Sequence, residues 1–408
     1  MTDVIVVGAG LAGLCCAKYL KKAGVSCRLI EASDDVGGRV RTDLVDGFKL
    51  DRGFQVFLTA YPEARKILDY ERLHLRTFYP GALIRQGGMF HRLADPFRRV
   101  IDGLATAFSP LGSFLDKLKV AELRVKLEFT SLEQIFRAPE STTAQFLAKQ
   151  GFSEDFINSF FRPFFGGVFL DRNLNTSSRQ FEFVYKMMAS GDIALPATGM
   201  QQIPLQLAEG LDITFNRPVK AVTRDTVTLT DGQQIKCKAV VLAVDAAQAA
   251  ALTNGEVAVP KWRSVVCIYF AMPTPPTPEP ILVLNGEKDG LVNNLAVLSA
   301  VSSEYAPADS SLVSVTVLDA RGLGDAELQR AVLDEMRKWY GAVVDTWRHL
   351  RTYRITQALP AQEPPWSFEQ PARLDSGIYV CGDYRENASI NGAMASGRRA
   401  AELLLKSL

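Results

Sequence analysis

The sequence predicts an α/β fold, α+β over the whole chain, in which a parallel sheet is joined by a mixed sheet and a block of helices. Three observations support this prediction. An apolar, β-branched run at residues 4–7 is followed by a helical pattern over 12–23 and a second apolar run at 25–32. A helical pattern dominates residues 95–190, and apolar and polar residues alternate over 212–245. A strand–helix–strand opening implies parallel strands that are covered on both faces.

The composition is that of an ordinary folded chain and excludes several classes of protein. The 408 residues allow one large unit or two to three interleaved domains, with 47% hydrophobic and 22% charged residues. A formal net charge of +1 gives no electrostatic basis for binding nucleic acid. Six cysteines and three histidines show neither a CxxC pair nor a Cys/His ligand spacing. We therefore expect no nucleic-acid partner, no metal site and no disulfide framework.

The N-terminal apolar run does not have the pattern of a targeting or membrane segment. It follows a short acidic start, lacks a basic region before it, and is interrupted by Gly8, Gly10 and Gly13. We therefore expect a cytoplasmic protein that does not span a membrane.

Local signals predict where helices end and begin in the middle and the last third of the chain. Pro110, Gly151 and Pro163 are expected to end helices of the 95–190 block. Asp325 is expected to cap a helix over residues 326–341. The apolar stripe of that helix consists of Leu328, Val332, Leu333, Met336 and Trp339.

The strand-rich part of the chain is punctuated by turn residues. The pair Asp231-Gly232 predicts the tight turn of an antiparallel meander over 212–245. The proline-rich residues 272–280 predict a surface connection, and further short strands are expected over 281–317.

A glycine-rich turn joins the first strand to the first helix. Gly8, Gly10 and Gly13 match G-x-G-x-x-G, which supplies a tight turn, a close approach of the backbone to a pyrophosphate, and close helix-to-strand packing. The N–H groups and dipole of the following helix attract the anion. Glu31 ends the second strand, where a carboxylate accepts hydrogen bonds from an adenosine ribose and repels a 2′-phosphate. The pattern predicts a Rossmann-like unit for NAD or FAD rather than NADP.

The segment after Glu31 distinguishes these two cofactors. Residues 31–42 read EASDDVGGRVRT, and E-A-x-x-x-x-G-G-R resembles the extended signature of FAD-binding flavoproteins of the amine oxidase superfamily. Gly38 permits the backbone to approach a phosphate, and Arg39 offers a guanidinium that can pair with pyrophosphate oxygens. The resemblance implies FAD.

The stretch FKLDRGFQVFLTAYPEA, residues 48–64, resembles the segment that passes the flavin ring in phytoene desaturases and related enzymes. The resemblance implies that Gly53 lets the backbone lie against the flat ring, with Phe54 and Gln55 as the adjacent side chains. Pro62 is expected to begin a helix.

Residues 379–404 resemble the C-terminal flavin-binding motif of the same superfamily. The resemblance implies that Asp383 bonds the ribityl or phosphate-proximal hydroxyls and that Gly382 leaves them room. A helix is expected to begin near Ser389, with its positive end at the pyrimidine edge of the flavin. The residues expected to present backbone N–H groups there are Ile390, Asn391, Gly392 and Ala393. In RPVKAV, Val219 resembles the strand that approaches the adenine.

The resemblance covers both ends of the chain and the central meander, and it implies an FAD-binding domain assembled from discontinuous segments, with a mixed-sheet substrate domain and a helical subdomain inserted. We assign residues 1–75, 196–255 and 370–408 to the FAD-binding domain, 76–94 and 256–369 to the substrate-binding domain, and 95–195 to the helical insertion.

Three departures from the amine oxidases bear on the substrate and on the flavin linkage. Val266 stands where these enzymes often carry a lysine, and Ser389 stands where they carry an aromatic residue. Residues 384–390 contain no cysteine for a covalent flavin link, so we expect non-covalent FAD.

The motifs resemble more closely the phytoene desaturase and protoporphyrinogen oxidase branch. This implies an FAD-dependent oxidoreductase, a dehydrogenase, desaturase or oxidase, that removes hydride from a C–H bond of a small apolar organic substrate to flavin N5. Oxygen or another acceptor would reoxidise the flavin. No catalytic base is assigned; Arg354 and Gln357 are candidate polar groups of the cavity.

Several alternatives stay open at this point. The chain could be an amine or amino-acid oxidase, a non-redox flavin isomerase similar to sugar-nucleotide mutases, or an FAD-binding protein without turnover. Peripheral membrane contact through residues 96–124 is a further open question. Residues 85–126 hold eight Lys/Arg and four Asp/Glu among the apolar side chains Phe97, Phe108, Leu111, Phe114 and Leu115.

Overall fold

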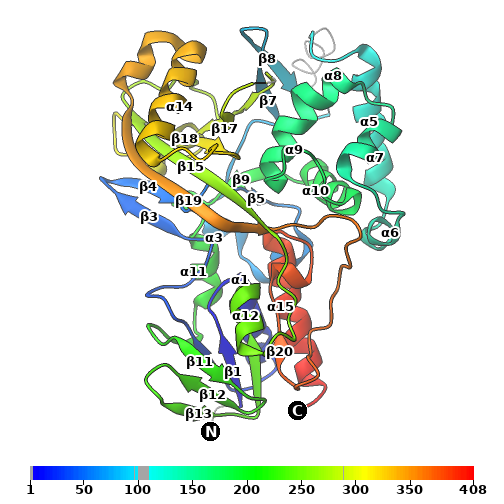
Figure 1. The fold of residues 1–408 in the computed structure, drawn as a ribbon, viewed down its shortest axis with the longest axis vertical. Helices are drawn as coiled ribbons and strands as arrows, with labels where there is room; N and C mark the ends of the chain where they lie inside the picture. Colours follow the sequence, from blue (N-terminus) through cyan, green and yellow to red (C-terminus); the bar gives the residue numbers. More distant parts are fainter. Residues whose placement is uncertain (1–2, 96, 100–109, 288) are drawn as a thin grey trace.

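A parallel sheet near both chain termini forms one end of the molecule (Figure 1). The structure, a computed structural model, describes residues 3–95, 97–99, 110–287 and 289–408. The order of the five parallel strands is β10-β2-β1-β14-β20. Their bounds are β1 Val4–Val7, β2 Cys27–Ile30, β10 Asp212–Thr214, β14 Ala239–Leu242 and β20 Tyr379–Val380. Strands from the beginning, middle and end of the chain thus build one sheet, as the fold class predicts.

Two helices from opposite ends of the chain pack closely beside this sheet. Helix α1 spans Leu11–Lys22, and α15 spans Ile390–Leu405. A Cβ atom at Gly397 would lie 2.2 Å from the carbonyl oxygen of Ala12, so the backbones touch at this point. Two shorter helices, α11 (Gln202–Ala208) and α12 (Ala246–Leu252), complete this part of the molecule.

The predicted meander over 212–245 is shorter than expected. Only β11 (Val219–Val222), β12 (Thr226–Leu229) and β13 (Gln234–Lys236) form an antiparallel sheet. The expectation is wrong for β10 and β14, which are parallel strands of the large sheet. The alternation misled because β10 is an edge strand with one solvated face, and such strands alternate in either kind of sheet.

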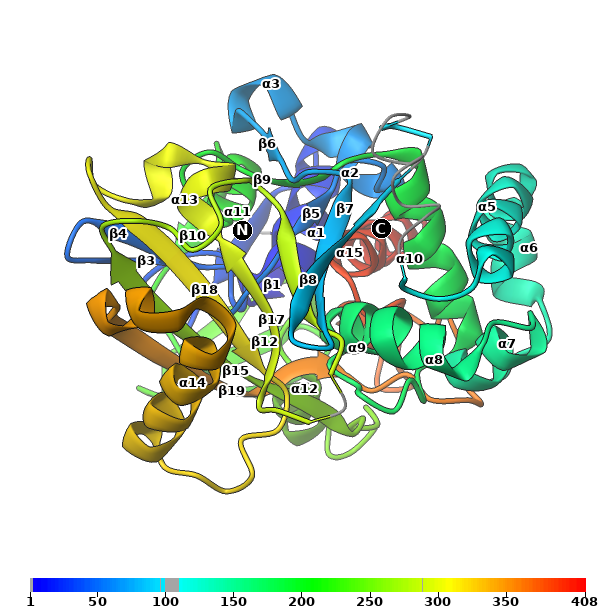
Figure 2. The same ribbon diagram turned by 90° about the horizontal axis from the view of Figure 1, so that it is seen from above.

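A seven-stranded mixed sheet forms the centre of the other half, in the order β19-β15-β18-β17-β16-β7-β8. Its strands are β7 Gly81–Gln86, β8 Met89–Ala94, β15 Trp262–Met272, β16 Leu282–Asn285, β17 Val292–Val297, β18 Ser311–Val317 and β19 Arg348–Pro360. Helix α14, Asp325–Tyr340, packs on one face, where it shares a core with Val266 and Phe270. Figure 2 shows α14 and the helices α9 and α10 on opposite sides of this sheet.

Helix α14 begins differently from the prediction. Its N-cap is Gly324, and the side chain of Glu327 accepts a hydrogen bond from the Gly324 N–H at 3.3 Å. Asp325 is the first residue inside the helix, and its carboxylate pairs instead with Arg354 at 2.6 Å. Glycine is also a frequent N-cap, so local sequence could not separate the two positions.

The helical block contains seven segments in its described part. They are α5 Phe114–Phe129, α6 Leu132–Arg137, α7 Thr143–Lys149, α8 Glu154–Phe156, the π-helix η1 Ile157–Phe161, α9 Arg162–Phe169 and α10 Ser178–Ser190. Gly151 ends α7 as expected, whereas Pro163 does not end a helix, because α8, η1 and α9 continue into one another with helical backbone angles. A π turn directly before Pro163 accommodates the missing N–H. A helix ending at Pro110 would fall on residues 100–109, outside the described residues.

Short elements connect the two halves. The hairpin of β3 (Thr42–Val45) and β4 (Phe48–Asp51) lies between them, and β5 (Phe57–Leu58), β9 (Ile193–Leu195) and β6 (Arg76–Thr77) form a small sheet. The remaining helices are α2 Pro62–Ile67, α3 Tyr70–Leu73, α13 Leu298–Val301, η2 Ser303–Tyr305, η3 Gly341–Thr346 and η4 Asp383–Arg385. Pro62 begins α2, as predicted. In the described part of the chain, no helix is long and apolar enough to cross a membrane.

Candidate functional site

The three glycines of the first turn have different surroundings. A Cβ at Gly8, which has φ +103°, would lie 2.7 Å from the Ala243 carbonyl oxygen, and one at Gly13 would lie 2.0 Å from that of Gly8. No atom of the described chain lies within 4 Å of the Cβ position of Gly10. Gly8 and Gly13 are therefore required by packing, whereas Gly10 borders open space.

The second glycine turn lies directly beside the first. Gly37 forms a parallel bridge with Gly10, and its N–H donates to the Ala9 carbonyl at 2.9 Å. Gly38 has φ +59°, and its Cβ position lies 3.6 Å from the Cα of Gly10. Two turns that are 27 residues apart in the sequence thus line the same open space.

The carboxylate of Glu31 fixes the first turn. Its Oε2 accepts the Ala9 N–H at 2.6 Å, and its Oε1 accepts the N–H and hydroxyl of Ser33 at 2.9 and 2.7 Å. The Arg217 N–H donates to the Glu31 carbonyl, which brings the RPVKAV segment to the same place. Val219, at the start of β11, pairs with Leu229. The acid and this segment therefore lie together beside the glycine turns.

Arg39 and Asp383 are 344 residues apart and form an ion pair at 2.6 Å. Arg39 also donates to the Ala358 carbonyl at 2.9 Å and lies over the ring of Trp262. Asp383 is 5% exposed, whereas two-fifths of the Arg39 side chain is exposed. The two predicted phosphate-side residues therefore meet, with the guanidinium turned partly to solvent.

The glycine before Asp383 has a packing reason of its own. A Cβ at Gly382 would lie 2.4 Å from the ring of Tyr384, so this glycine accommodates the tyrosine rather than open space. Its N–H donates to the hydroxyl of Ser396 at 3.1 Å. The expectation that Gly382 leaves room for cofactor hydroxyls has no support in this contact.

Helix α15 begins at the predicted place with part of its first turn unsatisfied. Ser389 is the N-cap, and its hydroxyl oxygen accepts the N–H of Gly392 at 3.0 Å. The Ser389 backbone carbonyl accepts the N–H of Ala393. Among the described residues, no acceptor bonds the N–H groups of Ile390 and Asn391. The half-buried side chains of Ile390 and Ala393 leave this end accessible, and the Asn391 amide oxygen instead accepts the N–H of Glu63 at 3.0 Å.

The turn after β4 connects the two halves of the molecule. Gly53 has φ +92°, and its Cβ position lies 2.7 Å from the Cδ1 of Ile355 on β19. Gln55 donates to the Arg39 carbonyl at 2.9 Å, which links this turn to the second glycine turn. Phe54 packs edge-on against Phe78.

The face of β15 that points to this turn differs from the one expected. Val266 packs into the core with α14, whereas Cys267 lies on the opposite face, against the Phe54 N–H and 3.2 Å from the Ser314 hydroxyl. Burial raises the pKa of the Cys267 thiol to about 11. Because side chains alternate along a strand, Cys267 rather than Val266 is the residue of β15 that faces this turn.

The two candidate cavity residues on β19 are placed differently. The Arg354 guanidinium pairs with Asp325 at 2.6 Å and donates to the Leu323 carbonyl, so its charge is directed to α14. The expectation that Arg354 serves the site is therefore wrong. Gln357 is exposed.

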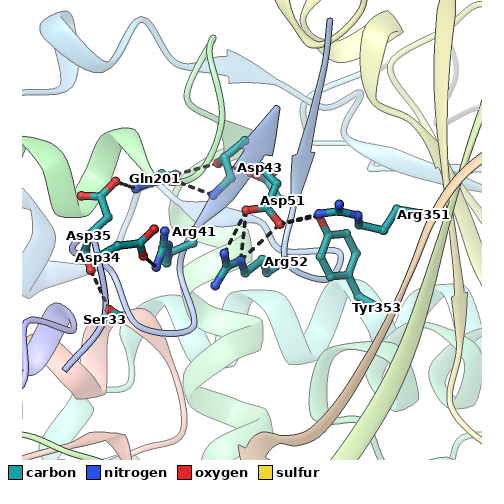
Figure 3. A network of polar contacts seen from close by, with 11 residues as sticks. Ser33, Asp34, Asp35, Arg41, Asp43, Asp51, Arg52, Gln201, Arg351 and Tyr353 are labelled. Atoms are coloured by element: carbon teal, nitrogen blue, oxygen red, sulfur yellow. Dashed lines mark hydrogen bonds and ion pairs between the residues drawn. The ribbon is translucent and has the colours of Figure 1, made fainter. Parts of the chain in front are cut away.

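Sequence reasoning missed a buried carboxylate two residues before Gly53. Asp51 is 1% exposed and accepts hydrogen bonds from the Thr42 hydroxyl, the Met200 N–H and the Tyr305 hydroxyl. Figure 3 shows the surrounding network, in which the Gln201 side chain donates to Asp35, in the segment between Glu31 and the second glycine turn. An acidic residue at the end of an otherwise buried strand, FKLD, was the available signal.

Two surface cavities lie away from these turns. One, of about 700 Å³, lies between α8, η1, α14 and the loop after β16. The other, of about 780 Å³, lies beside α2 and α3. Neither cavity is lined by the glycine turns or by the start of α15. These two cavities therefore do not coincide with the motifs predicted to bind the cofactor. The candidate site lies instead at the glycine turns and the start of α15, because the N-terminus of α1 has no side-chain cap and the described residues offer no acceptor to the N–H groups of Ile390 and Asn391.

The arrangement fits an extended dinucleotide. The open space at Gly10 and Gly38 admits a phosphate close to the backbone, and the N-terminus of α1 has no side-chain cap. Glu31 bonds the first glycine turn through the Ala9 N–H, and α15 leaves the N–H groups of Ile390 and Asn391 without an acceptor among the described residues. The described residues contain no group of three or more metal-ligating side chains.

Comparison with known families identifies the class. The sequence profile of the family described as flavin containing amine oxidoreductase matches residues 11–405. The chain belongs to this family, which places it among the FAD-dependent oxidoreductases and confirms the resemblance seen in its motifs.

Curated relatives match over shorter segments. A carotenoid 3,4-desaturase of Haloarcula japonica is 35% identical over 119 residues, which are 26% of this chain and 24% of that protein. Protoporphyrinogen oxidase 2 of Arabidopsis thaliana is 25% identical over 170 residues, 40% of this chain and 32% of that protein. These matches span no more than about a third of either relative, so they do not transfer a substrate.

Solved structures share the fold over the whole chain. A putative protoporphyrinogen oxidase from Exiguobacterium sp. 255-15 aligns with a TM-score of 0.74 at 19% identity, covering 100% of this chain and 99% of that one. A putrescine oxidase double mutant gives 0.72 at 19%, covering 99% of each chain. Reduced UDP-galactopyranose mutase gives 0.72 at 16%, covering 100% and 96%. Three different activities share this fold almost equally, so the fold does not select among them.

Proposed function

We propose that this chain binds FAD without a covalent link and removes hydride from a C–H bond of an apolar organic substrate. The observation that carries the proposal is the bridge between the two glycine turns, together with the ion pair that joins Arg39 of the second turn to Asp383 of the C-terminal motif. The FAD-binding unit would comprise residues 1–75, 196–255 and 370–408, with the substrate unit and the helical insertion between these segments.

Each proposed contact follows from the chemistry of the residue. Glu31 would accept hydrogen bonds from the ribose hydroxyls, and Val219 would lie towards the adenine. Gly10, Gly38 and Arg39 would hold the pyrophosphate. Gly8 and Gly13 would shape the turn that does so, and Gly382 would shape the approach to Asp383.

The reactive end would be held by backbone groups. The flavin ring would lie against Gly53, Phe54 and Gln55, and the N-terminus of α15 at Ile390, Asn391 and Ala393 would face its electron-rich edge. Bound FAD supplies the acceptor for hydride, at flavin N5, and passes electrons to oxygen or another acceptor.

Non-covalent binding is supported by the state of the nearest cysteine. Cys381 directly precedes Gly382, but its side chain is fully buried in the core shared with Cys15 and Cys16. Burial raises the pKa of the Cys381 thiol to about 12, which keeps it neutral and unreactive.

An apolar substrate is supported by the side chains around Gly53. Val265 of β15 pairs with Ile355 of β19, which contacts the Gly53 position, and Cys267 follows on the same face with a neutral thiol. These strands offer no charged side chain at this contact, which favours an uncharged C–H donor over a cationic amine.

Anaerobic titration of the FAD-loaded protein tests the proposal. A polyene, a porphyrinogen and an amine panel are added separately while the visible flavin band is followed. Bleaching by the polyene or the porphyrinogen is expected. Bleaching by amines alone would contradict the proposal in favour of an amine or amino-acid oxidase. Absence of bleaching by every compound would also contradict it, in favour of a non-redox isomerase or a binding protein without turnover.

We also propose a peripheral membrane contact through the helix α5 part of residues 96–124. Phe97, Phe114 and Leu115 are 52%, 63% and 63% exposed, whereas Leu111 is buried at 1%. Phe108 lies outside the described residues. The exposed side chains are continued along α5 by Leu118, Val125 and Phe129, which gives the helix an uncovered apolar stripe.

A further inference from the structure

The carboxylate of Asp51 is buried without a neighbouring cation. It is 1% exposed, and among the described residues no Lys, Arg or His forms an ion pair with it. Three donors bond it instead: the Thr42 hydroxyl at 2.6 Å, the Met200 N–H at 2.9 Å and the Tyr305 hydroxyl at 2.8 Å. An ionised carboxylate in such a place has hydrogen bonds but no compensating charge, which makes the charged form costly.

The donors come from different parts of the fold. Thr42 lies on β3, Met200 precedes α11, and Tyr305 ends η2 beside the mixed sheet. The hydroxyl of Tyr269, on β15, donates to the backbone carbonyl of Asp51 at 2.8 Å. One residue thus joins the hairpin, the parallel-sheet half and the mixed-sheet half.

The same residue determines where the next turn lies. Asp51 ends β4, and Gly53 follows two positions later with φ +92° and its Cβ position 2.7 Å from Ile355. Gln55 then reaches the carbonyl oxygens of Arg39 and Arg52. A change in the bonds at Asp51 is therefore transmitted to the turn proposed to lie against the flavin.

Asp51 is the group of this cluster that changes charge near neutral pH. Burial raises its pKa to about 6, despite the hydrogen bonds that lower it. The titratable groups facing it are Tyr305, Tyr269 and Cys267, and burial raises the pKa of each. In the hairpin, the charged neighbours Asp43 and Arg52 pair with each other at 2.9 Å, and exposed Glu304 precedes Tyr305.

We infer that Asp51 is a positioning residue of the FAD site: its hydrogen bonds to Thr42, Met200 and Tyr305 hold the start of the Gly53–Gln55 turn in place, and FAD bound over that turn favours the neutral carboxyl group. This inference rests on the proposed FAD function. A flat ring over the turn would remove water from it, and the pyrophosphate would add negative charge; both disfavour ionised Asp51. FAD affinity therefore falls as the pH rises through the titration of Asp51.

Four proteins test this inference: the wild type, Asp51→Asn, Tyr305→Phe and the control Asp46→Asn. Asparagine at 51 keeps the acceptor for Met200 and stays neutral. Asp46 is exposed on the same hairpin with φ +50°, which asparagine adopts readily. The FAD dissociation constant is measured by flavin fluorescence between about pH 5 and about pH 8, alongside thermal unfolding of the protein without FAD.

The expected result is a loss of FAD affinity of about threefold to tenfold from the lower to the higher pH in the wild type, which corresponds to about half to one pKa unit. Asp46→Asn should follow the wild type, and Asp51→Asn should lack this loss. Tyr305→Phe removes a donor to the carboxylate and should move the midpoint to higher pH. This variant keeps the test decisive if Asp51→Asn does not fold.

Parallel pH profiles of the wild type and Asp51→Asn, or an unmoved midpoint in Tyr305→Phe, would overturn the inference alone. Failure of all four proteins to bind FAD at any pH, with cooperative unfolding retained, would overturn the proposed function on which it rests. The difference in thermal stability between wild type and Asp51→Asn is independent of FAD. From about pH 4 to about pH 7 the wild type should lose thermal stability relative to Asp51→Asn. The reason is that a group with a raised pKa in the folded state costs stability as the pH rises through that pKa, whereas asparagine does not titrate.

Discussion

Gly10 and Gly13 differ in what a single methyl group would meet, so the same substitution separates binding from folding. In Gly10→Ala the methyl group enters open space, and Gly10 has an ordinary extended backbone with φ −73°. We expect the free energy of unfolding to change by less than about 1 kcal/mol. FAD affinity should fall about tenfold or more, because the methyl group holds the pyrophosphate away from the backbone. Flavin fluorescence titration and urea unfolding measure the two effects.

Gly13→Ala is the matched control. Its methyl group would lie 2.0 Å from the Gly8 carbonyl oxygen, so the turn itself must shift. We expect a loss of about 1–3 kcal/mol in the free energy of unfolding of the protein without FAD. If Gly10→Ala lowered the free energy of unfolding as much as Gly13→Ala, the proposal that open space beside Gly10 receives the pyrophosphate would be contradicted.

The sequence predicted the residues of the site where short spacing defines them, and it missed those brought together by distant segments. The two glycine turns and Ser389 follow from local patterns, and the structure has each turn and the helix start where expected. Asp51 meets Met200 and Tyr305 across 149 and 254 residues, which no local pattern records. The cofactor contacts themselves stay predictions.

At the level of elements, Asp116 joins the start of two helices. It is 1% exposed and accepts the N–H and hydroxyl of Ser113 at 2.8 and 2.7 Å and those of Ser153 at 2.7 and 2.8 Å. Ser113 caps α5 and Ser153 caps α8. The Asp116 side chain therefore fixes the angle between the two ends of the helical block.

Asp116→Ala is expected to lower the free energy of unfolding by about 2–4 kcal/mol, since it removes one cap and leaves buried N–H groups without an acceptor. Burial alone would raise the pKa of Asp116, but the four hydrogen bonds leave it below its usual value. A lowered pKa contributes stability above the unfolded-state value of about 3.9 and loses it as the pH falls. Urea unfolding at about pH 7 and about pH 3 should therefore show a smaller difference from wild type at the lower pH.

Glu122→Ala, on the exposed side of α5, is the control and should change stability by no more than about 0.5 kcal/mol. A difference between Asp116→Ala and wild type that stays constant with pH would contradict the assignment of this effect to the ionised carboxylate.

Two elements show where sequence patterns reach their limit. The period of two in β10 reports a half-exposed strand, but the choice between parallel and antiparallel neighbours depends on segments as remote as Leu29. Pro163 is compatible with a continuing helix only because η1 widens before it, and that rearrangement is a product of tertiary packing.

At the scale of the whole molecule, helix α5, which carries the uncovered stripe, lies at the outer edge of the helical block (Figure 2). Its basic neighbours already have partners: Lys119 donates to the Gly151 carbonyl, Arg124 pairs with Asp95, and Lys126 lies over the ring of Phe146. The contact proposed for this surface would therefore be mainly apolar, and salt should weaken it little.

Liposome flotation tests this surface with vesicles of phosphatidylcholine and phosphatidylglycerol at low and high salt. The wild type is expected to float at both, and the double variant Leu118→Ser with Phe129→Ser should float much less, because it removes two exposed apolar side chains. Leu44→Ser, which removes a 73% exposed leucine on β3, is the control and should float like the wild type. Equal flotation of all three, or none by the wild type, would contradict the proposal.

The fold class was predictable because its signals are repeated along the chain. The strand–helix–strand opening with its glycine turn, the GGR segment and the terminal small-residue helix each point to the same family, and the family match over residues 11–405 confirms it. The contact between β15 and the Gly53 turn was not predictable in detail. A one-residue difference in register exchanges Val266 and Cys267 between the two faces of a strand.

The order of strands in the parallel sheet has a consequence for synthesis. β20 and α15 lie within the last 30 residues, from 379 to 408, yet they border β14 and α1. Chains emerge from the ribosome N-terminus first, and such remote pairings form slowly. The first glycine turn is therefore synthesised several hundred residues before the helix that completes its surroundings. Truncation of the last 30 residues should leave a chain in which Arg39 has no Asp383 to meet.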